Sequence, residues 1–482
     1  MRLRLFGPLL LLASLAAGFE ATWDTILQLT TNPQNQSLSY GYQRSIACDP
    51  HGNVHVCWLD QRSVPYQLWY RRFDRAAGVW RPETVLTNRS ANCQPPAVAA
   101  DGQGNLHVFW HLEANPYGIW YKRFDAGTSI WRPDSLFENA TAQLTKYYPS
   151  VSCRPGSREV HVVWYGSPDT GGSYQVFHRE LKPDSGWRRP VQLSSFVASH
   201  DQASLTVDSA GNVCAVWCCL DSTTETRQVF SRRRIGGVWQ PVELVSNMPD
   251  RATQYAPCVV AGSGGVWHFV WHGRTTQEFN HRIRYRNRSP SGWSDIVVVS
   301  SLPDEQQESP SVCFRPDGDC HVVWRGQTQS SSVYQLFYAC RESNGRWTTP
   351  LPLTQRSTGN VSRPAITADP DTCLHAIWFD ASSGNQDVYY LRGHERGTGT
   401  GEVAAQPRTR AVVRPSLLVG PYCRIVTTEP AELTLSDASG RVLRKTRTAG
   451  DFTLDCRRLP AGVYFLALRY PDSGELLKLV RP

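Results

Sequence analysis

The chain has 482 residues, of which 40% are hydrophobic and 19% are charged, and its formal net charge is +8. This length allows two to four ordinary domains, or one large repetitive domain with an appendage, and the hydrophobic content excludes a disordered chain. Tryptophan is abundant, with 17 residues beside only two methionines, and 36 glycines with 32 prolines indicate many turns. The composition argues against a helical bundle, a coiled coil and a transporter.

The first 18 residues have the pattern of a signal peptide. Arg2 and Arg4 supply a positive start, an apolar run follows, and small residues at 16–18 supply a cleavage site. The run is too short to cross a membrane, and no later stretch approaches 18 apolar residues. We therefore expect an exported protein without a transmembrane segment.

The 14 cysteines fit an exported chain, in which they could form disulfides or remain free thiols in the core. Cys313 and Cys320 flank a Pro-Asp-Gly turn and could face each other across a hairpin, and Cys423 and Cys456 are the two cysteines near the C-terminus. Both interpretations stay open at this point. Neither a CxxC pair nor a Cys/His spacing typical of zinc sites occurs, so we expect no metal and no other cofactor.

A repeat fills the middle of the chain. One tryptophan recurs seven times at spacings of 52 to 54 residues, and in six of the copies a histidine lies three residues before it. A second tryptophan follows the first by 21 to 23 residues in six copies. The first series is Trp58, Trp110, Trp164, Trp217, Trp271, Trp324 and Trp378, and the second is Trp80, Trp131, Trp187, Trp239, Trp293 and Trp347. A period of this size is typical of propellers and other repeat folds.

Each repeat is predicted to contain four short strands. A Pro/Ser-Val/Ile segment forms the first strand, a turn rich in Asp and Gly such as residues 49–53 follows, and the second strand carries the His-x-x-Trp sequence. The third strand begins with a sequence like that of residues 67–70, Gln-Leu-Trp-Tyr, and the fourth runs from the second tryptophan to a Leu-Thr or Leu-Ser pair. This pattern is typical of one blade of a β-propeller.

The two ends of the repeat array complement each other. The seventh repeat lacks the second tryptophan, whereas residues 23–30, Trp-Asp-Thr-Ile-Leu-Gln-Leu-Thr, form an unpartnered copy of the fourth strand. An N-terminal strand that completes the last repeat closes the ring and removes the two exposed sheet edges that an open array would leave. We therefore predict an all-β chain in which residues 19–395 form a seven-bladed β-propeller closed by its N-terminal strand.

The repeated turns and tryptophans resemble those of the sialidase-like superfamily of β-propellers, over residues 19 to about 395. For a catalytic member, the resemblance implies three arginines that bind a carboxylate, an aspartic acid, and a tyrosine activated by a glutamate. The Asp-box of that superfamily, Ser-x-Asp-x-Gly-x-x-Trp, is not reproduced, because the tryptophan follows the turn glycine by six residues, as from Gly52 to Trp58.

The C-terminal region differs from the repeats. Residues 396–410 have the Gly, Thr, Arg and Pro composition of a linker, and no tryptophan follows Trp378. Segments at 433–442, 459–465 and 478–480 resemble, in order, spacing and terminal position, the C-terminal sorting domain of the type IX (Por) secretion system. The resemblance implies a small immunoglobulin-like β-sandwich over residues 411–482, the type IX machinery as a partner, and a secreted or cell-surface protein that passes through the periplasm. The alternative is a structural or binding module of the same fold.

The repeated histidines and tryptophans are expected to have structural roles. Equivalent positions in six repeats indicate a hydrogen bond between strands in each blade rather than catalysis, and we expect the tryptophans to pack between blades. The histidines are His55, His107, His161, His268, His321 and His375.

Ligand-binding residues are expected where the repeats differ, in the segments before the first strands and in the loops after the second-strand tryptophans. In a propeller both open on one face around the central channel, and a guanidinium there could bind a carboxylate. Polar loop tips that only solvate the face are the alternative. The candidates are Arg44, Asp60, Arg62, His111, Glu113, Tyr165, Asp221, His272, Arg274, Arg325, Arg363 and Asp380.

Three hypotheses of function follow. The first is an exported, non-catalytic propeller that binds a glycan or a protein on its variable face, and we favour it because no motif fixes a set of catalytic residues. The second is a glycoside hydrolase of the exo-sialidase type. The third is a structural or adhesion component of the cell envelope. The arginines are scattered rather than clustered, so we expect no nucleic-acid partner.

Overall fold

The computed structural model describes residues 21–42, 44–112, 118–139, 145–168, 171–195, 198–221, 225–248, 252–300 and 305–394, and in the C-terminal part residues 411–414, 422–427, 431–437, 441–448, 451–457, 459–469 and 474–481. The described residues form β-strands and one 3₁₀ turn, Ser263–Gly265, so the predicted all-β class is confirmed. No helix within these ranges has the length and apolarity that a membrane crossing requires. The chain separates into two compact units, Met1–Arg396 and Gly397–Pro482.

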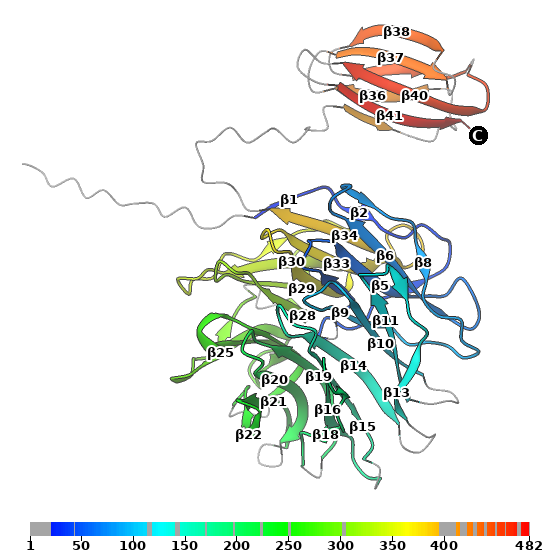
Figure 1. The fold of residues 1–482 in the computed structure, drawn as a ribbon. Coiled ribbons are helices and arrows are strands. Elements are labelled where there is room, and N and C mark those ends of the chain that lie inside the picture. Colours follow the sequence, from blue (N-terminus) through cyan, green and yellow to red (C-terminus); the bar gives the residue numbers. More distant parts are fainter. Residues whose placement is uncertain are drawn as a thin grey trace, which may run out of the picture. The chain divides into compact units, whose positions relative to one another are not determined.

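The strands of the first unit form seven antiparallel sheets, numbered here in the order of the sequence repeats (Figure 1). Sheet 1 contains β3 (Gln36–Ser37), β4 (Ile46–Cys48), β5 (Val54–Asp60), β6 (Gln67–Asp74), β7 (Val79–Trp80) and β8 (Thr84–Val85). Sheet 2 contains β9 (Ala97–Ala100), β10 (Leu106–Leu112), β11 (Gly118–Asp125), β12 (Ile130–Trp131) and β13 (Ser135–Asn139). Sheet 3 contains β14 (Lys146–Cys153), β15 (Val160–Gly166), β16 (Gln175–Lys182), β17 (Gly186–Trp187) and β18 (Val191–Gln192).

The remaining sheets follow the same pattern. Sheet 4 contains β19 (His200–Val207), β20 (Val213–Asp221), β21 (Thr226–Ile235) and β22 (Val238–Leu244). Sheet 5 contains β23 (Thr253–Ala261), β24 (Trp267–Arg274), β25 (Arg282–Ser289), β26 (Gly292–Trp293) and β27 (Val297–Val298). Sheet 6 contains β28 (Gln307–Phe314), β29 (Cys320–Thr328), β30 (Ser331–Arg341) and β31 (Leu351–Pro352). Sheet 7 contains β32 (Ser362–Ala368), β33 (Leu374–Asp380), β34 (Asp387–His394), β1 (Thr22–Trp23) and β2 (Leu27–Gln28).

The N-terminal strand pairs with the last repeat, as the sequence indicates. Trp23 lies opposite Gly393, and Leu27 lies opposite Tyr390 (Figure 1). The ring of Trp23 occupies the space where a Cβ at Gly393 would stand, 2.9 Å from the nearest ring carbon. Glycine at this position therefore lets the tryptophan pack directly on the backbone of β34.

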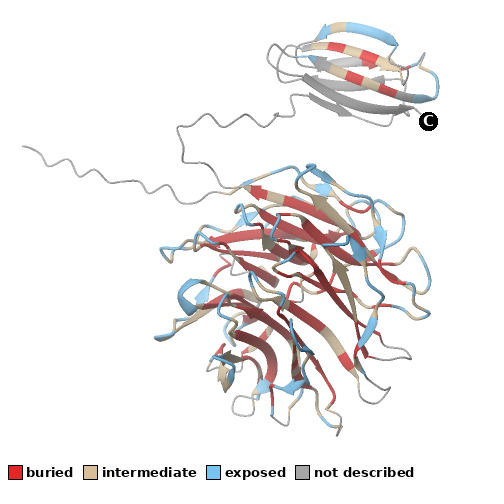
Figure 2. Cartoon of the chain, viewed as in Figure 1, coloured by how far each residue is buried: buried red, intermediate tan, exposed pale blue. Residues whose placement is uncertain are grey.

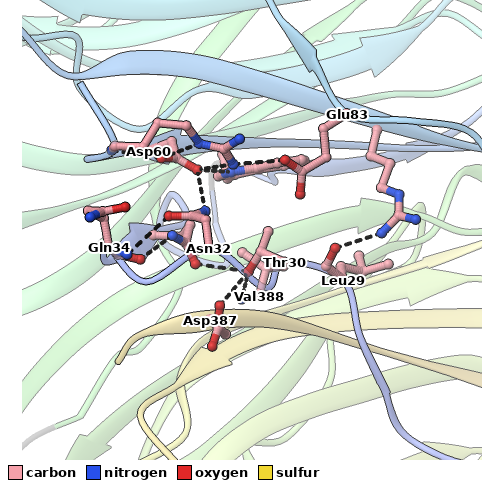
Figure 3. A network of polar contacts seen from close by, with 12 residues as sticks. Leu29, Thr30, Asn32, Gln34, Asp60, Glu83, Asp387 and Val388 are labelled. Atoms are coloured by element: carbon pink, nitrogen blue, oxygen red, sulfur yellow. Dashed lines mark hydrogen bonds and ion pairs between the residues drawn. The ribbon is translucent and has the colours of Figure 1, made fainter. Parts of the chain in front are cut away.

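Residues 29–35 then connect sheet 7 to sheet 1. The N–H of Leu29 donates to the carbonyl of Val388, and the N–H of Val388 donates to the hydroxyl of Thr30 (Figure 3). On the other side, the Asn32 amide donates to Asp60 of β5 over 3.2 Å. The first and last repeats are thus joined through this short segment.

The second strands form the best-buried part of each sheet. Every residue of β5, β10, β15 and β33 is buried, and these strands lie within the red interior of Figure 2. The tryptophan of the first series is at most 1% exposed in all seven sheets. Since one such residue packs in each core cluster between neighbouring sheets, the tryptophan count reflects the fold, as predicted.

Residues 38–45 contact the first strands of many sheets. The Arg44 guanidinium donates to the carbonyl of Val259 in β23 over 2.8 Å, and the Ser150 hydroxyl of β14 donates to the carbonyl of Tyr42. A Cβ at Gly41 would stand 2.5 Å from the carbonyl oxygen of Pro364. Only glycine fits this close approach, so the segment lies where the first strands of several sheets converge.

The cysteines that the structure describes in the first unit are free thiols. Of the two interpretations left open by the sequence, the free thiol therefore holds for Cys313 and Cys320. Cys313 lies opposite His321 and Cys320 lies opposite Phe314, so the two cysteines are one position out of register and belong to core clusters on different faces of the sheet. The side chain of Cys423, one of the two cysteines near the C-terminus, lies outside the described part of the structure.

The second unit contains two sheets. The first is formed by β35 (Ala411–Arg414), β36 (Tyr422–Thr427) and β39 (Asp451–Asp455). The second is formed by β37 (Ala431–Asp437), β38 (Val442–Thr448), β40 (Gly462–Arg469) and β41 (Gly474–Arg481). The predicted hairpin is present, since β37 pairs with β38 and Asp437 accepts hydrogen bonds from Arg441 across the turn.

Candidate ligand-binding surface

The first strands of five sheets each contain a β-bulge at an equivalent place. In β14, β19, β23, β28 and β32 the register against the second strand shifts beside the residue that follows the buried tryptophan. One residue of each bulge has a positive φ without being glycine, which costs energy and is concentrated at functional sites. These residues are Tyr148, Gln202, Ala256, Ser309 and Arg363.

Tyrosine side chains gather around the bulges of sheets 3 and 5 and the 38–45 segment. Tyr40 contacts Tyr148 edge-on at 6.0 Å between ring centroids, and Tyr148 stacks on Tyr165 at 5.9 Å. Tyr147 in turn contacts Tyr174 at 5.8 Å. Tyr165 is buried, and the other four residues are half-buried, so each of these four keeps part of its surface accessible.

Three arginines lie over tyrosine rings of this group and its neighbours. The guanidinium of Arg363 is 4.3 Å from the Tyr40 centroid, and that of Arg325 is 4.6 Å from the Tyr334 centroid. Arg227 lies 5.3 Å from the Tyr255 centroid. We call this group the tyrosine–arginine surface: Tyr40, Tyr147, Tyr148, Tyr165, Tyr174, Tyr255, Tyr334, Arg227, Arg325 and Arg363.

Two of the three arginines are paired with acidic side chains. Arg227 forms an ion pair with Asp201, and Arg325 lies 2.5 Å from Glu308. Arg363 donates to the Leu38 carbonyl over 2.7 Å instead, and within the described ranges it has no acidic partner. The surface therefore carries a positive charge that its own carboxylates do not fully neutralise.

A polar network of sheets 5 and 6 borders this surface. The N–H of Ser309 donates to Nδ1 of His272, and Glu308 lies 3.4 Å from Nδ1 of His281. Burial and the neighbouring His281 lower the pKa of His272 to about 3, so its imidazole is neutral at pH 7. Burial alone would raise the pKa of Glu308, but hydrogen bonds from His281 and Gln306 and the charge of Arg325 hold it below its usual range.

The repeated histidines are structural, as the sequence predicts. Nδ1 of His55 lies 2.8 Å from the Tyr70 hydroxyl of the adjacent strand, and Nε2 lies 3.1 Å from the Asp49 carboxylate. Burial acts to raise the pKa of Asp49, but hydrogen bonds from His55 and Asn53 lower it to about 2. His107 and His375 repeat this arrangement with their own tyrosine and aspartate.

Stability should fall as the pH drops below about 6.5, the model-compound pKa of histidine. Burial lowers the pKa of several histidines in the folded state, to about 4 for His268 and about 3 for His272. Because the folded-state values are depressed, the stabilisation is complete above pH 6.5 and is lost as the pH falls toward the folded values, by roughly 1.4 kcal/mol per pH unit for each histidine. Urea unfolding at pH 7 and pH 5 measures this. A His268→Gln variant should show a shallower pH dependence, and an unchanged slope would contradict the assignment.

Four of the twelve predicted residues lie on the tyrosine–arginine surface or directly beside it. Tyr165, Arg325 and Arg363 belong to the surface, and His272 borders it through its stacking on Tyr255 at 5.7 Å. His111 lies beneath this surface. The centroid of its ring is 4.6 Å from that of Tyr148, and the residue is fully buried.

Other predicted residues stabilise the sheets. Asp60 and Asp380 are buried and accept hydrogen bonds from the indole N–H groups of Trp58 and Trp378. Arg62 pairs with Asp60 at 2.8 Å, and the guanidinium of Arg44 donates to the β23 backbone as described above.

The last three predicted residues are elsewhere or outside the described ranges. The exposed guanidinium of Arg274 donates to the Phe279 carbonyl, and Asp221 ends β20 opposite Thr226. Glu113 lies outside the described residues. The predicted loop positions need one correction, because eight of the candidates stand inside the second strands, near their ends. These are Asp60, His111, Tyr165, Asp221, His272, Arg274, Arg325 and Asp380.

Comparisons with solved structures give the fold type. A PL25 ulvan lyase, described as a new family of polysaccharide lyase, has a TM-score of 0.54 and 9% identity, over 74% of this chain and 94% of that chain. The same kind of lyase bound to -[GlcA(1-4)Rha3S]- gives 0.54 and 10% identity, over 76% and 95%. A Hadza microbial sialidase gives 0.44 and 12% identity, over 70% and 73%. No protein-family model and no curated protein matches the sequence. The unit therefore has a fold of the β-propeller type.

Several residues of the surface are not among the sequence candidates. They stand in first or third strands, directly before a third strand, or in the segment before β4, and not after the buried tryptophans. These residues are Tyr40, Tyr147, Tyr148, Tyr174, Arg227, Tyr255 and Tyr334. The adjacent pair Tyr147 and Tyr148 is the one sequence signal that could have pointed to them, because two bulky neighbours on a strand face opposite sides unless a bulge intervenes.

Proposed function

We propose that the protein binds an acidic polysaccharide on the tyrosine–arginine surface. The observation that carries the proposal is the placement of Arg227, Arg325 and Arg363 over half-buried tyrosine rings. A tyrosine offers an apolar face to a sugar ring and a hydroxyl to its polar groups, and a guanidinium fork matches a carboxylate or a sulfate.

Two further observations favour an anionic glycan over a neutral one. The chain has a formal net charge of +8, which attracts anionic partners over long range. The solved structures with TM-scores above 0.5 include a lyase bound to a repeat of glucuronate and sulfated rhamnose. At 10% identity this likeness concerns the fold, and it supplies the choice of probe.

The test is a binding titration with oligosaccharides of the -[GlcA(1-4)Rha3S]- repeat. We expect saturable binding that weakens as salt is added, because charge-assisted contacts are screened. A neutral arabinan oligosaccharide serves as the control and should bind far less. Equal affinity for both ligands, or no binding of either, would refute the proposal.

The other hypotheses predict different results in the same experiment. A hydrolase of the exo-sialidase type would release dye from a fluorogenic sialoside, and an enzyme that cleaves the acidic repeat would shorten the oligosaccharide during the titration. A purely structural or adhesive protein would not bind the glycan in this titration and would instead bind a protein of the cell envelope. We favour binding without cleavage.

We also infer that the seven sheets are the blades of one closed ring. The inference rests on the pairing of β1 and β2 with β34, and on residues 29–35, which bond to sheets 7 and 1. Hydrogen exchange is the check: the amides of β34 should lose protection in a chain that lacks residues 21–30, and equal protection would argue against closure.

We propose further that residues 1–18 direct export and that residues 411–482 serve type IX secretion. The basis is the N-terminal sequence pattern together with the hairpin of β37 and β38 at the predicted place. The protein would then be secreted or held at the cell surface. Cell fractionation with and without residues 411–482 tests this, and secretion of the truncated chain at the full level would refute it.

A further inference from the structure

The repeated histidine, replaced by Cys214 in sheet 4, stands at the centre of a row of three residues that crosses the first, second and third strands of each sheet. Residues directly opposite each other in such a ladder share a face and lie about 5 Å apart. The rows are Ala47/His55/Arg72, Ala99/His107/Arg123, Ser152/His161/Glu180, Thr206/Cys214/Arg233, Val260/His268/Asn287, Cys313/His321/Cys340 and Thr367/His375/Arg392. Sheet 6 alone places a cysteine on each side of the histidine.

The turn before the histidine also differs in sheet 6. In sheet 1 the N–H of Asp49 donates to the carbonyl of Asn53, and in sheet 6 the N–H of Arg315 donates to the carbonyl of Asp319. In sheet 6 the acidic residue is therefore Asp319, at the opposite end of the turn from the position that Asp49 has in sheet 1. It lies two positions before His321, on the same face of the strand.

These differences between sheet 6 and the other sheets bring a carboxylate, an imidazole and a thiol together. The ligand atoms of Asp319, His321 and Cys340 all lie within 4.8 Å of one another, and all three residues are buried. Bond lengths of about 2.0–2.3 Å from zinc to oxygen, nitrogen and sulfur would bring such ligands to within about 4.5 Å of one another. Small rotations of the three side chains would bring their ligand atoms to the distances that one ion requires.

We propose that Asp319, His321 and Cys340 bind a divalent transition-metal ion of the zinc type. A donor set of thiolate, imidazole and carboxylate suits zinc and excludes calcium and magnesium, which take oxygen ligands. The carboxylate and one thiolate balance the two charges of the ion.

The two other groups of possible ligands are less suited to an ion. In the group of Glu159, His161 and Glu180, the side chain of Lys182 already lies between the two carboxylates. In the group of His272, His281 and Glu308, the polar network described above already uses Nδ1 of His272 and both oxygens of Glu308.

A disulfide does not explain the two cysteines of the row. Cys313 and Cys340 stand on strands that flank β29, and two strand spacings separate them by about 9.6 Å. A disulfide requires Cα atoms closer than about 7 Å. Cys313 and Cys340 are therefore too far apart for a disulfide, and both are free thiols.

The experiment is a titration of the full, metal-depleted chain with Co²⁺ and then Zn²⁺. We expect one tightly bound ion per chain, a sulfur-to-cobalt charge-transfer absorption, and its loss when Zn²⁺ displaces Co²⁺. The Cys340→Ser variant should bind at least 100-fold more weakly and lack the absorption. Cys57→Ser, which alters an equally buried cysteine of sheet 1, should behave like the wild type.

X-ray absorption of the zinc-loaded wild-type chain keeps the proposal testable if the variant does not fold. Sulfur in the first coordination shell is the expected result. Binding of less than one ion per chain, a shell without sulfur, or an absorption that survives Cys340→Ser would each overturn the proposal. Cys313→Ser, which alters the cysteine on the other side of His321, should leave the number of sulfur atoms in the shell unchanged.

Discussion

Replacing Asp380 by alanine should lower the free energy of unfolding by about 3 kcal/mol or more. The Asp380 carboxylate is buried, accepts the indole N–H of Trp378 over 2.9 Å and lies 3.2 Å from the Arg356 guanidinium. An unsatisfied buried donor costs about 1–3 kcal/mol, and the loss of one member of a largely buried ion pair adds to it. Chemical denaturation of the purified chain measures the difference.

The matched controls separate a structural role from ligand binding. Asp380→Asn keeps an acceptor for Trp378 and should be destabilised by less than the alanine variant. Asp184→Ala removes an exposed carboxylate and should change stability by less than about 0.5 kcal/mol. If Asp380→Ala is as stable as the wild type but fails to bind glycan, Asp380 belongs to the binding site and the structural assignment is wrong.

The Arg227→Gln/Arg325→Gln double variant should bind the acidic oligosaccharide about 100-fold more weakly. Each guanidinium can form a charge-assisted hydrogen bond of about 1.5–3 kcal/mol, and 1.4 kcal/mol corresponds to tenfold in affinity. Each single variant should therefore lose about tenfold. Isothermal titration at low salt, with the same ligand for all variants, measures these changes.

Arg81→Gln is the control for the loss of charge. Arg81 is exposed and paired with Asp74 at 2.7 Å, and it stands in the segment after β7, away from the tyrosine–arginine surface. Its substitution should change affinity by less than twofold. An equal loss for Arg81→Gln and for the double variant would indicate a general effect of net charge and would contradict a defined binding surface.

The repeat could be predicted from the sequence because each residue that defines it strongly prefers one kind of structural position. A buried tryptophan, a histidine three positions earlier and a turn glycine recur at nearly constant spacing, and each reports a local requirement of one sheet. The pairing of Trp23 with β34 was predictable for the same reason, since one repeat lacked the strand that the N-terminus supplied.

The candidate surface was only partly predictable, because it depends on contacts between repeats. The adjacent pair Tyr147 and Tyr148 is a weak sequence signal for the bulge in β14, and the approach of Arg227 to Tyr255 joins two different sheets. The expectation of no metal rested on spacing along the chain. Asp319, His321 and Cys340 come together across a ladder instead, where sequence separation has no bearing on distance.

The pairing of the N-terminal strand with β34 also sets a limit on when the first unit can finish folding. Thr22 bonds to His394, which lies 372 residues later. Because the chain is synthesised from its N-terminus, residues 21–30 must remain without their partner strand until nearly the whole unit has been made. Contacts of such long sequence separation also form slowly. We expect the last step of folding to be the docking of this strand, which would keep the chain incomplete, and accessible to a translocation machinery, until synthesis has passed the seventh repeat.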